Sequence, residues 1–345
     1  MSQYLFYLFT SFIFNITLII PFIDLLYRLK FQRAHQKTLD MFDKRTPIFD
    51  KFHFIKAGRP VGGGLLIVVT TTFIFLFVLL LHVLFGITIH SNYQSVVAEI
   101  SILLFTFLSF SLLGLYDDLK KIFFWKKDSF FGLRTRHKFI LEVILGLIIS
   151  FMIYFYLNVH FVNIPFFGVY DVSYFYILFS TFVIVAFANA VNITDGLDGL
   201  STGVLMIALI AFWVVSRTIV DTPLSIFIAV WLGGIIAFLY FNIYPARIFL
   251  GDSGALSFGA TFAVIGLLLG KGFVLPIIGG VFIIEISSSF IQILSKRFRH
   301  KKFFPVAPFH LMLQYMGWEE PKIVMRIWLA AILFASLGLM IAFMK

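Results

Sequence analysis

Residues 173–200 read SYFYILFSTFVIVAFANAVNITDGLDGL, an apolar run that ends in a polar, glycine-rich turn. The apolar part has the roughly 20 residues that a helix needs to cross a bilayer core of about 30 Å. Gly196 and Gly199 disfavour a regular helix beyond about Thr194. Four polar side chains recur at every third position, and they are Asn189, Asn192, Asp195 and Asp198. Capping explains only one Asn and one Gly, so we interpret the set as functional. A carboxylate beside hydrocarbon is costly unless it is paired, hydrated or bound to a cation.

The composition extends the membrane interpretation to the whole chain. Hydrophobic residues make up 61% and charged residues 13% of the 345 residues, against about half and about a quarter in a soluble domain. We expect an all-α polytopic membrane protein in which residues 1–345 form a single integral-membrane domain. The absence of Cys excludes disulfides, thiolate metal sites and a Cys nucleophile. The first apolar run lacks a basic segment before it and a small-residue cleavage site, so we expect a retained helix and not a signal peptide.

Ten apolar runs predict about ten transmembrane helices. They cover residues 4–27, 61–85, 96–116, 138–157, 173–192, 201–220, 223–243, 255–270, 272–294 and 325–344. With ten spans, 24 of the 27 Lys and Arg residues fall on one face, which the positive-inside rule makes cytoplasmic. We therefore expect both termini outside and the active site on the cytoplasmic face, where the acidic loops meet. The net charge of +10 follows from this topology and requires no nucleic-acid partner.

Two further acidic groups stand where apolar runs end or begin. Asp117 and Asp118, in GLYDD, close the third run. Neighbouring helical residues point about 100° apart, so the two acids should do different jobs, such as binding a metal and accepting a proton. Local ion pairs with Lys120 and Lys121 are the alternative. Asp252, in FLGDSG, is either an ordinary helix cap or a ligand whose flanking glycines permit close approach. Together with the turn described above, these acids predict a metal or phosphate site at a membrane surface.

Other residues carry weaker signals. Lys56 begins KAGRPVGGG, whose basic residues and glycine amides suit a phosphate. Lys and Arg are, however, common beside membrane helices. Lys138, which opens the fourth run, has the same two interpretations. Phe249 either packs or stacks on a planar base. His310 is a lone loop histidine, a type that is more often a surface residue than a catalyst. Glu285 lies within the ninth run, and we interpret it as a helix-packing or groove residue. A Gly-rich loop ending in GK[ST] is missing from the sequence, which disfavours ATP hydrolysis.

In combination, these motifs resemble a known enzyme family. GLYDDLKK, NAVNITDGLDGL, FLGDSGAL and a late His loop, in this order, resemble the polyprenyl-phosphate N-acetylhexosamine-1-phosphate transferases. KAGRPVGGG, APFH and GWEEPKIVMRIW are similar to the phospho-N-acetylmuramoyl-pentapeptide branch. Two positions depart from that pattern. His310-Leu311-Met312 stands where the family has three histidines, and Glu142 stands where a Gln is common.

The resemblance implies a reaction and its partners. The branch transfers phospho-MurNAc-pentapeptide from UDP-MurNAc-pentapeptide to undecaprenyl phosphate, giving lipid I and UMP in peptidoglycan synthesis, with Mg²⁺ as cofactor. It implies a multi-pass protein of the bacterial inner membrane, surrounded by membrane lipids, without a nucleic-acid partner, and suggests a homodimer.

The resemblance also implies roles for individual residues. The catalytic residues would be Asp117, Asp118, Asn192, Asp195 and His310. The substrate-binding residues would be Lys56, Lys138, Asn189, Asp198, Asn242 and Phe249. The Mg²⁺ ligands would be Asp252 and Asp195. Within the substrate site, the resemblance assigns Asp198, Asn242 and Phe249 to the uridine, with Phe249 stacking on uracil.

Three alternatives remain open at this stage. A sister transferase that uses UDP-GlcNAc or another UDP-N-acetylhexosamine fits the reduced His run, whereas GWEEPKIVMRIW argues against it. A transporter or flippase would place carboxylates deep within the spans, where Glu285 is the one clear example. A catalytically inactive scaffold would keep the fold and lose the nucleotide site.

Overall fold

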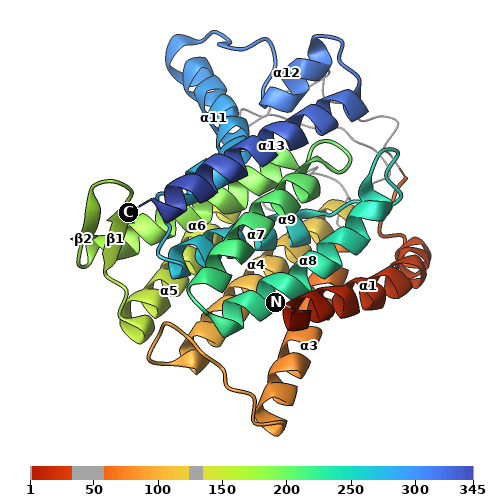
Figure 1. Cartoon of the computed structure of the whole chain (residues 1–345). Coiled ribbons are helices and arrows are strands. Elements are labelled where there is room, and N and C mark those ends of the chain that lie inside the picture. Colours follow the sequence, from red (N-terminus) through yellow and green to blue (C-terminus); the bar gives the residue numbers. More distant parts are fainter. Residues whose placement is uncertain (1, 33–57, 124–134, 345) are drawn as a thin grey trace.

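The computed structural model describes residues 2–32, 58–123 and 135–344, and most of them are helical (Figure 1). The helices are α1 (Ser2–Arg28), α3 (Gly63–Leu84), α4 (Val96–Phe123), α5 (Thr135–Leu157), α6 (Phe175–Thr194), α7 (Leu200–Thr218), α8 (Thr222–Asn242), α9 (Asp252–Leu268), α10 (Leu275–Ile278), α11 (Gly280–Leu294), the π-helical turn η2 (Ser295–Arg299), α12 (Phe309–Tyr315) and α13 (Glu320–Phe343). The strands β1 (Phe161–Ile164) and β2 (Gly168–Asp171) pair antiparallel in a small hairpin, which the sequence did not predict.

Eight helices in the described ranges are long and apolar enough to cross a membrane: α1, α3, α4, α5, α6, α7, α8 and α13. They match eight of the ten predicted runs, so the helical, polytopic class is confirmed. The main boundary differences are at α4, which continues to Phe123 instead of ending at residue 116, and at α13, which begins at Glu320 instead of residue 325. In both helices the extra residues are partly polar. They were left out of the predicted runs because those runs were bounded by hydropathy.

The remaining two predicted spans differ from the expectation. Helix α9 has 17 residues, every one of them buried, and at 1.5 Å per residue it is shorter than a bilayer core of about 30 Å. The predicted continuous span 272–294 is wrong, because α10 ends at Ile278 and α11 begins at Gly280. At this break Gly280 lies against the ring of Phe334, and a Cβ added there would be 2.6 Å from Phe334 Cδ1. The total of ten spans stays a prediction.

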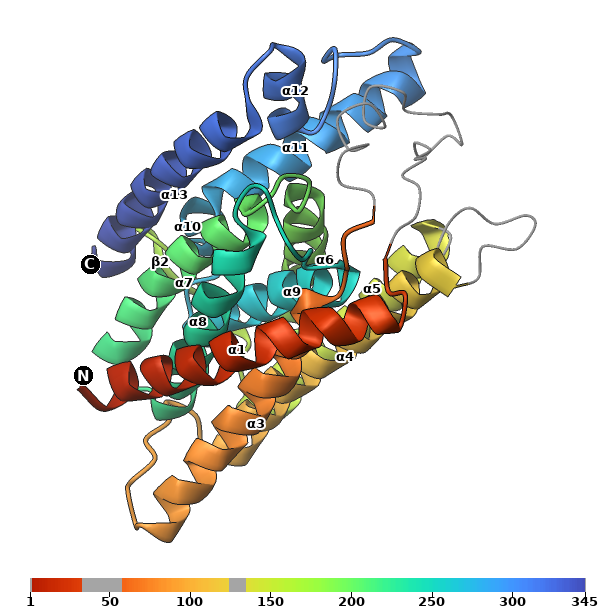
Figure 2. The same cartoon turned by 90° about the vertical axis from the view of Figure 1, so that its right-hand side faces the viewer.

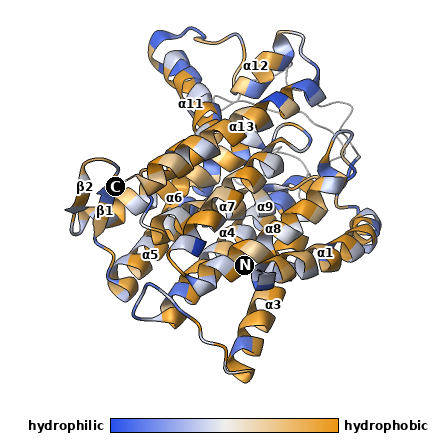
Figure 3. Cartoon of the chain, viewed as in Figure 1, coloured by the Kyte–Doolittle hydropathy of each residue, from blue (hydrophilic) through white to orange (hydrophobic). Residues whose placement is uncertain are grey.

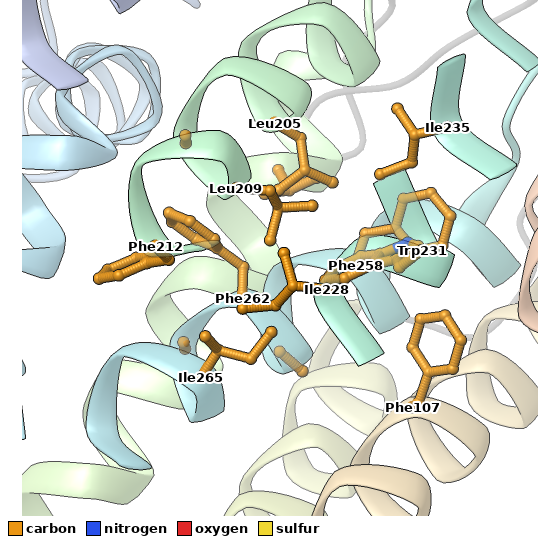
Figure 4. Packing of buried hydrophobic residues seen from close by; sticks show 14 of the residues in the cluster. Phe107, Leu205, Leu209, Phe212, Ile228, Trp231, Ile235, Phe258, Phe262 and Ile265 are labelled. Atoms are coloured by element: carbon orange, nitrogen blue, oxygen red, sulfur yellow. The ribbon is translucent and has the colours of Figure 1, made fainter. Parts of the chain in front are cut away.

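Helices α8 and α9 form the centre of the molecule. Helix α9 packs on α4 and α6, while α8 packs on α1, α3 and α7. Phe107 of α4, Trp231 of α8 and Phe258 of α9 meet in a fully buried aromatic cluster, with Leu205 and Leu209 of α7 beside it (Figure 4). A helix that is apolar on all sides is stable only when neighbouring helices surround it. The short α9 is therefore stabilised by packing against neighbouring helices and not by contact with lipid.

The two chain termini lie at one end of the helix bundle, and the end of α4 and the start of α5 lie at the opposite end (Figure 2). Hydrophilic residues gather at helix ends and connections, including the tip of α11 and the start of α13 (Figure 3). Placing both termini on one side agrees with the predicted topology. Which side faces the cytoplasm stays a prediction from the Lys and Arg distribution.

Candidate active site

Close backbone contacts between glycines bring three helix ends together. A Cβ added to Gly64, at the start of α3, would lie 2.2 Å from the Cα of Gly254 in α9. A Cβ added to Gly114 of α4 would lie 2.1 Å from the carbonyl oxygen of Asp252. Side chains at these positions would push the helices apart. The end of α4 and the start of α9 are therefore held in direct contact, and their carboxylates with them.

Gly62, Gly63 and Gly64 of KAGRPVGGG hold this junction, and their amides do not form an open phosphate cradle. The amides of Gly62 and Gly63 donate to the carbonyl of Phe249 at 3.1 and 2.9 Å, and the amide of Gly64 donates to the carbonyl of Leu250 at 2.9 Å. Backbone amides that already donate to carbonyls are not available to a phosphate. Lys56, the basic residue predicted to bind substrate at the start of this motif, lies outside the described residues.

Two aspartates and two lysines form a closed ring of ion pairs at this junction. Lys121 Nζ lies 2.9 Å from Asp117 Oδ2 and 2.8 Å from Asp252 Oδ2. Lys138 Nζ lies 3.1 Å from Asp117 Oδ2 and 2.5 Å from Asp252 Oδ2. The carboxylates are buried, whereas the lysine side chains keep 28% and 13% exposure. The positively charged lysines are thus the more exposed part of the ring, and the carboxylates are the buried part.

Asp118 does a different job from its neighbour Asp117. Its Oδ2 accepts a hydrogen bond from the amide of Ser253 at 3.1 Å, and the residue is fully buried. The amides of a helix's first turn have no partner within the helix, so Asp118 of α4 stabilises the start of α9. The two acids thus make different contacts, Asp118 with the backbone and Asp117 with the lysines. That one binds a metal and the other accepts a proton stays a prediction.

Asn189 and Glu142 form a second layer behind Lys138. Asn189 Nδ2 donates to Glu142 Oε2 at 2.5 Å and to the carbonyl of Val185 at 2.9 Å. Glu142 is fully buried one helical turn after Lys138, and its Oε1 has no hydrogen-bond partner among the described residues. A Gln would supply the same acceptor oxygen to Asn189 without the charge, so the Glu adds negative charge beside the lysine.

The polar turn after α6 is fixed mainly through its backbone. Asp198 Oδ2 accepts from the amide of Ala246 at 2.9 Å and from Arg59 at 3.4 Å. Asn242 Oδ1 accepts from the amide of Gly199 at 3.2 Å and from Thr202, while its Nδ2 donates to the carbonyl of Ile248. These two buried side chains therefore join the turn to the loop that leads to Phe249.

The C-terminal helix α13 also holds this turn. Glu320 Oε1 accepts from the amide of Asp198 at 2.6 Å, and Trp328 Nε1 donates to the carbonyl of Gly199 at 3.2 Å. The Trp328 ring lies against Gly203, where an added Cβ would be 2.2 Å from the indole. Both residues belong to GWEEPKIVMRIW, so this segment of the sequence has a direct contact with the acidic turn.

His310, at the start of α12, lies beneath the same turn. Its Nδ1 is 3.0 Å from Glu285 Oε2, and both side chains are only 1% exposed. A Cβ added to Gly196 would be 2.3 Å from His310 Nε2. The structure therefore places the imidazole between α11 and the turn, buried and not at the surface.

The other predicted site residues are less directly connected to the ring of ion pairs. Asn192 and Asp195 are half-buried at the end of α6. Phe249 is also half-buried, and no ring stacking partner for it occurs among the described residues. Its backbone pairs with Pro60 and Val61, which fixes its position.

The residues present fit a magnesium ion that is bound partly by the protein and partly by a substrate. The described part of the chain contains no group of three or more His, Cys, Asp or Glu side chains that is arranged to hold a metal, so Asp117, Asp195 and Asp252 do not form one. Mg²⁺ is often held by one or two carboxylates together with substrate phosphates. Asp252, which lies beside both lysines, fits an ion that binds together with a diphosphate.

Several residues that shape the site were not assigned to it from the sequence. Lys121, Glu142, Glu285 and Glu320 contact predicted site residues directly, and Trp328 contacts Gly199 in the acidic turn. The signal for Glu285 was its position within an apolar run, where a carboxylate needs a partner. The signal for Lys121 was its spacing of four residues from Asp117, which brings the two onto one helix face.

Comparison with known proteins agrees with this geometry. Residues 100–270 match the family model described as glycosyl transferase family 4. The chain is 34% identical to a phospho-N-acetylmuramoyl-pentapeptide-transferase of Rickettsia prowazekii, over 94% of this chain and 90% of the relative. It is 35% identical to the proteins of the same name from Rickettsia felis and Rickettsia canadensis, with the same coverage. The chain therefore belongs to the phospho-N-acetylmuramoyl-pentapeptide transferase family, within glycosyl transferase family 4.

Proposed function

We propose that this chain transfers phospho-MurNAc-pentapeptide from UDP-MurNAc-pentapeptide to undecaprenyl phosphate, giving lipid I and UMP. The observation that carries the proposal is the ring of Asp117, Lys121, Lys138 and Asp252 at the junction of three helices. Relatives in the phospho-N-acetylmuramoyl-pentapeptide transferase family, which match nearly the whole chain at about one third identity, support it.

The charge arrangement suits two phosphorylated substrates. A diphosphate and a lipid monophosphate repel each other unless cations lie between them. Lys121 and Lys138 are partly exposed and already anchored by buried carboxylates, so they would meet the phosphates without losing their position. Phosphoryl transfer needs mainly such positioning and charge stabilisation.

In the proposed step an oxygen of the lipid phosphate attacks the β-phosphorus of the UDP-sugar. A new P–O bond forms, the bond to the α-phosphate oxygen breaks, and UMP leaves with the electron pair. Asp117 accepts a residual proton from the lipid phosphate, if one is present. Asp252, with Asp195, would hold Mg²⁺, which when bound supplies positive charge between the phosphates.

The uridine would bind beside Phe249, with the ring of this residue stacking on uracil. Asp198 and Asn242 support that position by holding the loop before Phe249. Asn189 and Asn192 of α6 would contribute polar contacts to the substrate between the turn and the ring of ion pairs. Lys56 would add a further basic contact to the substrate.

The protein is a multi-pass protein of the bacterial inner membrane, as its apolar helices and its family require. We propose that residues 1–345 form one transferase domain, with the site on the cytoplasmic face, and that the chain forms a homodimer.

The reaction can be tested with the purified full chain in detergent. We expect lipid I and UMP to form from UDP-MurNAc-pentapeptide and undecaprenyl phosphate, to stop with EDTA and to resume with Mg²⁺. Asp117→Asn and Asp252→Asn should each abolish transfer while the protein stays monodisperse and folded. Wild-type turnover by either variant would rule out its proposed role.

The second candidate function is transfer from UDP-GlcNAc or another UDP-N-acetylhexosamine. The presence of only one histidine in His310-Leu311-Met312 favours it. The contacts of Glu320 and Trp328, both in GWEEPKIVMRIW, with the acidic turn support the first candidate. Parallel assays with the two nucleotide sugars separate the candidates. Turnover of UDP-GlcNAc alone would favour the second.

A further inference from the structure

Both carboxylate oxygens of Glu285, in α11, accept hydrogen bonds from one residue. Among the described residues, its side-chain hydrogen bonds all come from His310. The His310 amide lies 3.1 Å from Oε1 and 3.3 Å from Oε2, and the His310 ring Nδ1 lies 3.0 Å from Oε2. Both side chains are buried. A buried carboxylate that accepts from both the backbone and the ring of one histidine fixes the position of that ring.

The same contacts fix which ring nitrogen carries the proton. A carboxylate only accepts hydrogen bonds, so Nδ1 must be the donor. Nε2 is left to face the other way, where it lies against Gly196 in the acidic turn. The imidazole thus connects α11 to the backbone between Asp195 and Asp198.

We infer that Glu285 is a positioning residue, which through the imidazole of His310 sets the placement of the turn at residues 195–198. The inference rests on the proposed function, because it treats that turn as part of the transfer site. The residues after His310 are Leu311 and Met312, so in this chain one imidazole alone makes the connection.

Gln292 of α11 and Ser295, the first residue of η2, hold the segment 301–304 that leads toward α12. Among the described residues, neither makes a hydrogen bond with the turn. Gln292 Oε1 accepts from the amides of Phe303 and Phe304 at 3.0 and 2.9 Å. Ser295 Oγ donates to the carbonyl of Lys301 at 2.9 Å. These contacts attach the segment to α11 through its backbone. Ser295 is therefore a matched control for Glu285, since it anchors the same segment without touching the imidazole.

The proton position can be measured in the full chain without any activity assay. With ¹⁵N-labelled histidine, the His310 signal is assigned by its loss in His310→Gln. We expect Nδ1 to be protonated in the wild type. In Glu285→Gln the amide has only one acceptor oxygen for two donors, so we expect its N–H₂ group to donate to Nδ1 and the proton to move to Nε2. An unprotonated Nδ1 in the wild type would overturn the inference, even if the variant did not fold.

The effect on the turn is measured by a double-mutant cycle on kcat/KM. Glu285→Gln should lower kcat/KM about 10- to 100-fold, by analogy with carboxylates that orient metal-binding histidines, whereas Ser295→Ala should leave it unchanged. If Glu285 acts through His310, Glu285→Gln combined with His310→Gln should lose no more than His310→Gln alone. Losses that multiply would contradict the relay.

Failure of this inference is distinguishable from failure of the proposed function. A chain with Nδ1 protonated but no transfer from either nucleotide sugar would refute the proposed function and leave the Glu285–His310 pair in place. An active chain in which Glu285→Gln changes neither the ring protonation nor kcat/KM would refute the inference alone.

Discussion

Asp117 and Asp252, from the end of α4 and the start of α9, share their ion-pair partners. Lys138 Nζ lies 3.1 Å from Asp117 Oδ2 and 2.5 Å from Asp252 Oδ2, and Lys121 contacts the same two oxygens. Two buried carboxylates this close to each other require cations between them. The lysines supply that charge in the structure, and we propose that they keep this position when the phosphates of the substrates bind.

The first prediction concerns Lys138. Lys138→Met keeps much of the apolar stem and removes the charge, so transfer should fall by roughly 100-fold or more, the usual effect of losing one donor to a developing anion. Lys120→Met is the matched control, because Lys120 lies over the Tyr116 ring at 4.9 Å and outside the ring of ion pairs. Steady-state assays of both variants test this, and equal activities would be inconsistent with a role for Lys138 at the phosphates.

The second prediction concerns Glu142. Glu142→Gln keeps the acceptor for Asn189 and removes a buried charge that has one oxygen without a partner. We expect the unfolding temperature in detergent to stay equal or rise. Glu142→Ala removes one of the two acceptors of Asn189 Nδ2 and leaves only the Val185 carbonyl, which should cost about 1–3 kcal/mol. A Glu142→Gln protein as unstable as Glu142→Ala would show that the charge itself is required.

The third prediction concerns Gly196. Gly196→Ala places a methyl group 2.3 Å from His310 Nε2, and overpacking of this kind costs about 1–3 kcal/mol. We expect lower thermal stability and lower activity. His310→Ala provides space for the methyl group, so the destabilisation by Gly196→Ala should be smaller in that background. Equal destabilisation in both backgrounds would mean that the imidazole is not the obstacle.

The fourth prediction concerns the pH dependence of stability at the start of α8. Burial raises the pKa of Asp221, which lies near Glu99 and accepts from Asn92. A raised pKa means that the folded state binds the proton more tightly than the unfolded state. This contribution to stability is therefore present at low pH and is lost as pH rises through the folded-state pKa.

Asp221→Asn removes this titration and keeps a residue type that caps helices well, as Asp221 does through the Leu224 amide at 3.0 Å. Unfolding temperatures measured across the acidic and neutral range should decrease less with pH in the variant than in the wild type. The same pH slope in both proteins would contradict the prediction.

Local sequence patterns were sufficient for much of the helical architecture. Eight apolar runs became long helices because a segment of about 20 apolar residues satisfies its backbone only as a helix in a bilayer. The prediction for 272–294 was wrong because hydropathy shows only that the run is apolar. It does not show that Gly279 and Gly280 permit a break in the helix where α13 packs closely. The β-hairpin was missed because its strands have only four residues each.

By itself, the sequence determined that this chain is a helical membrane protein with acidic motifs at the ends of apolar runs. Hydrophobic run length and charge spacing are local properties, so the chain order contains them. Only the tertiary structure decided which side chains meet: Asp117 with Lys138, Asp118 with the start of α9, and Glu285 with His310. These partners come from different helices, and their contacts depend on how closely glycine-lined backbones approach, which no local pattern specifies.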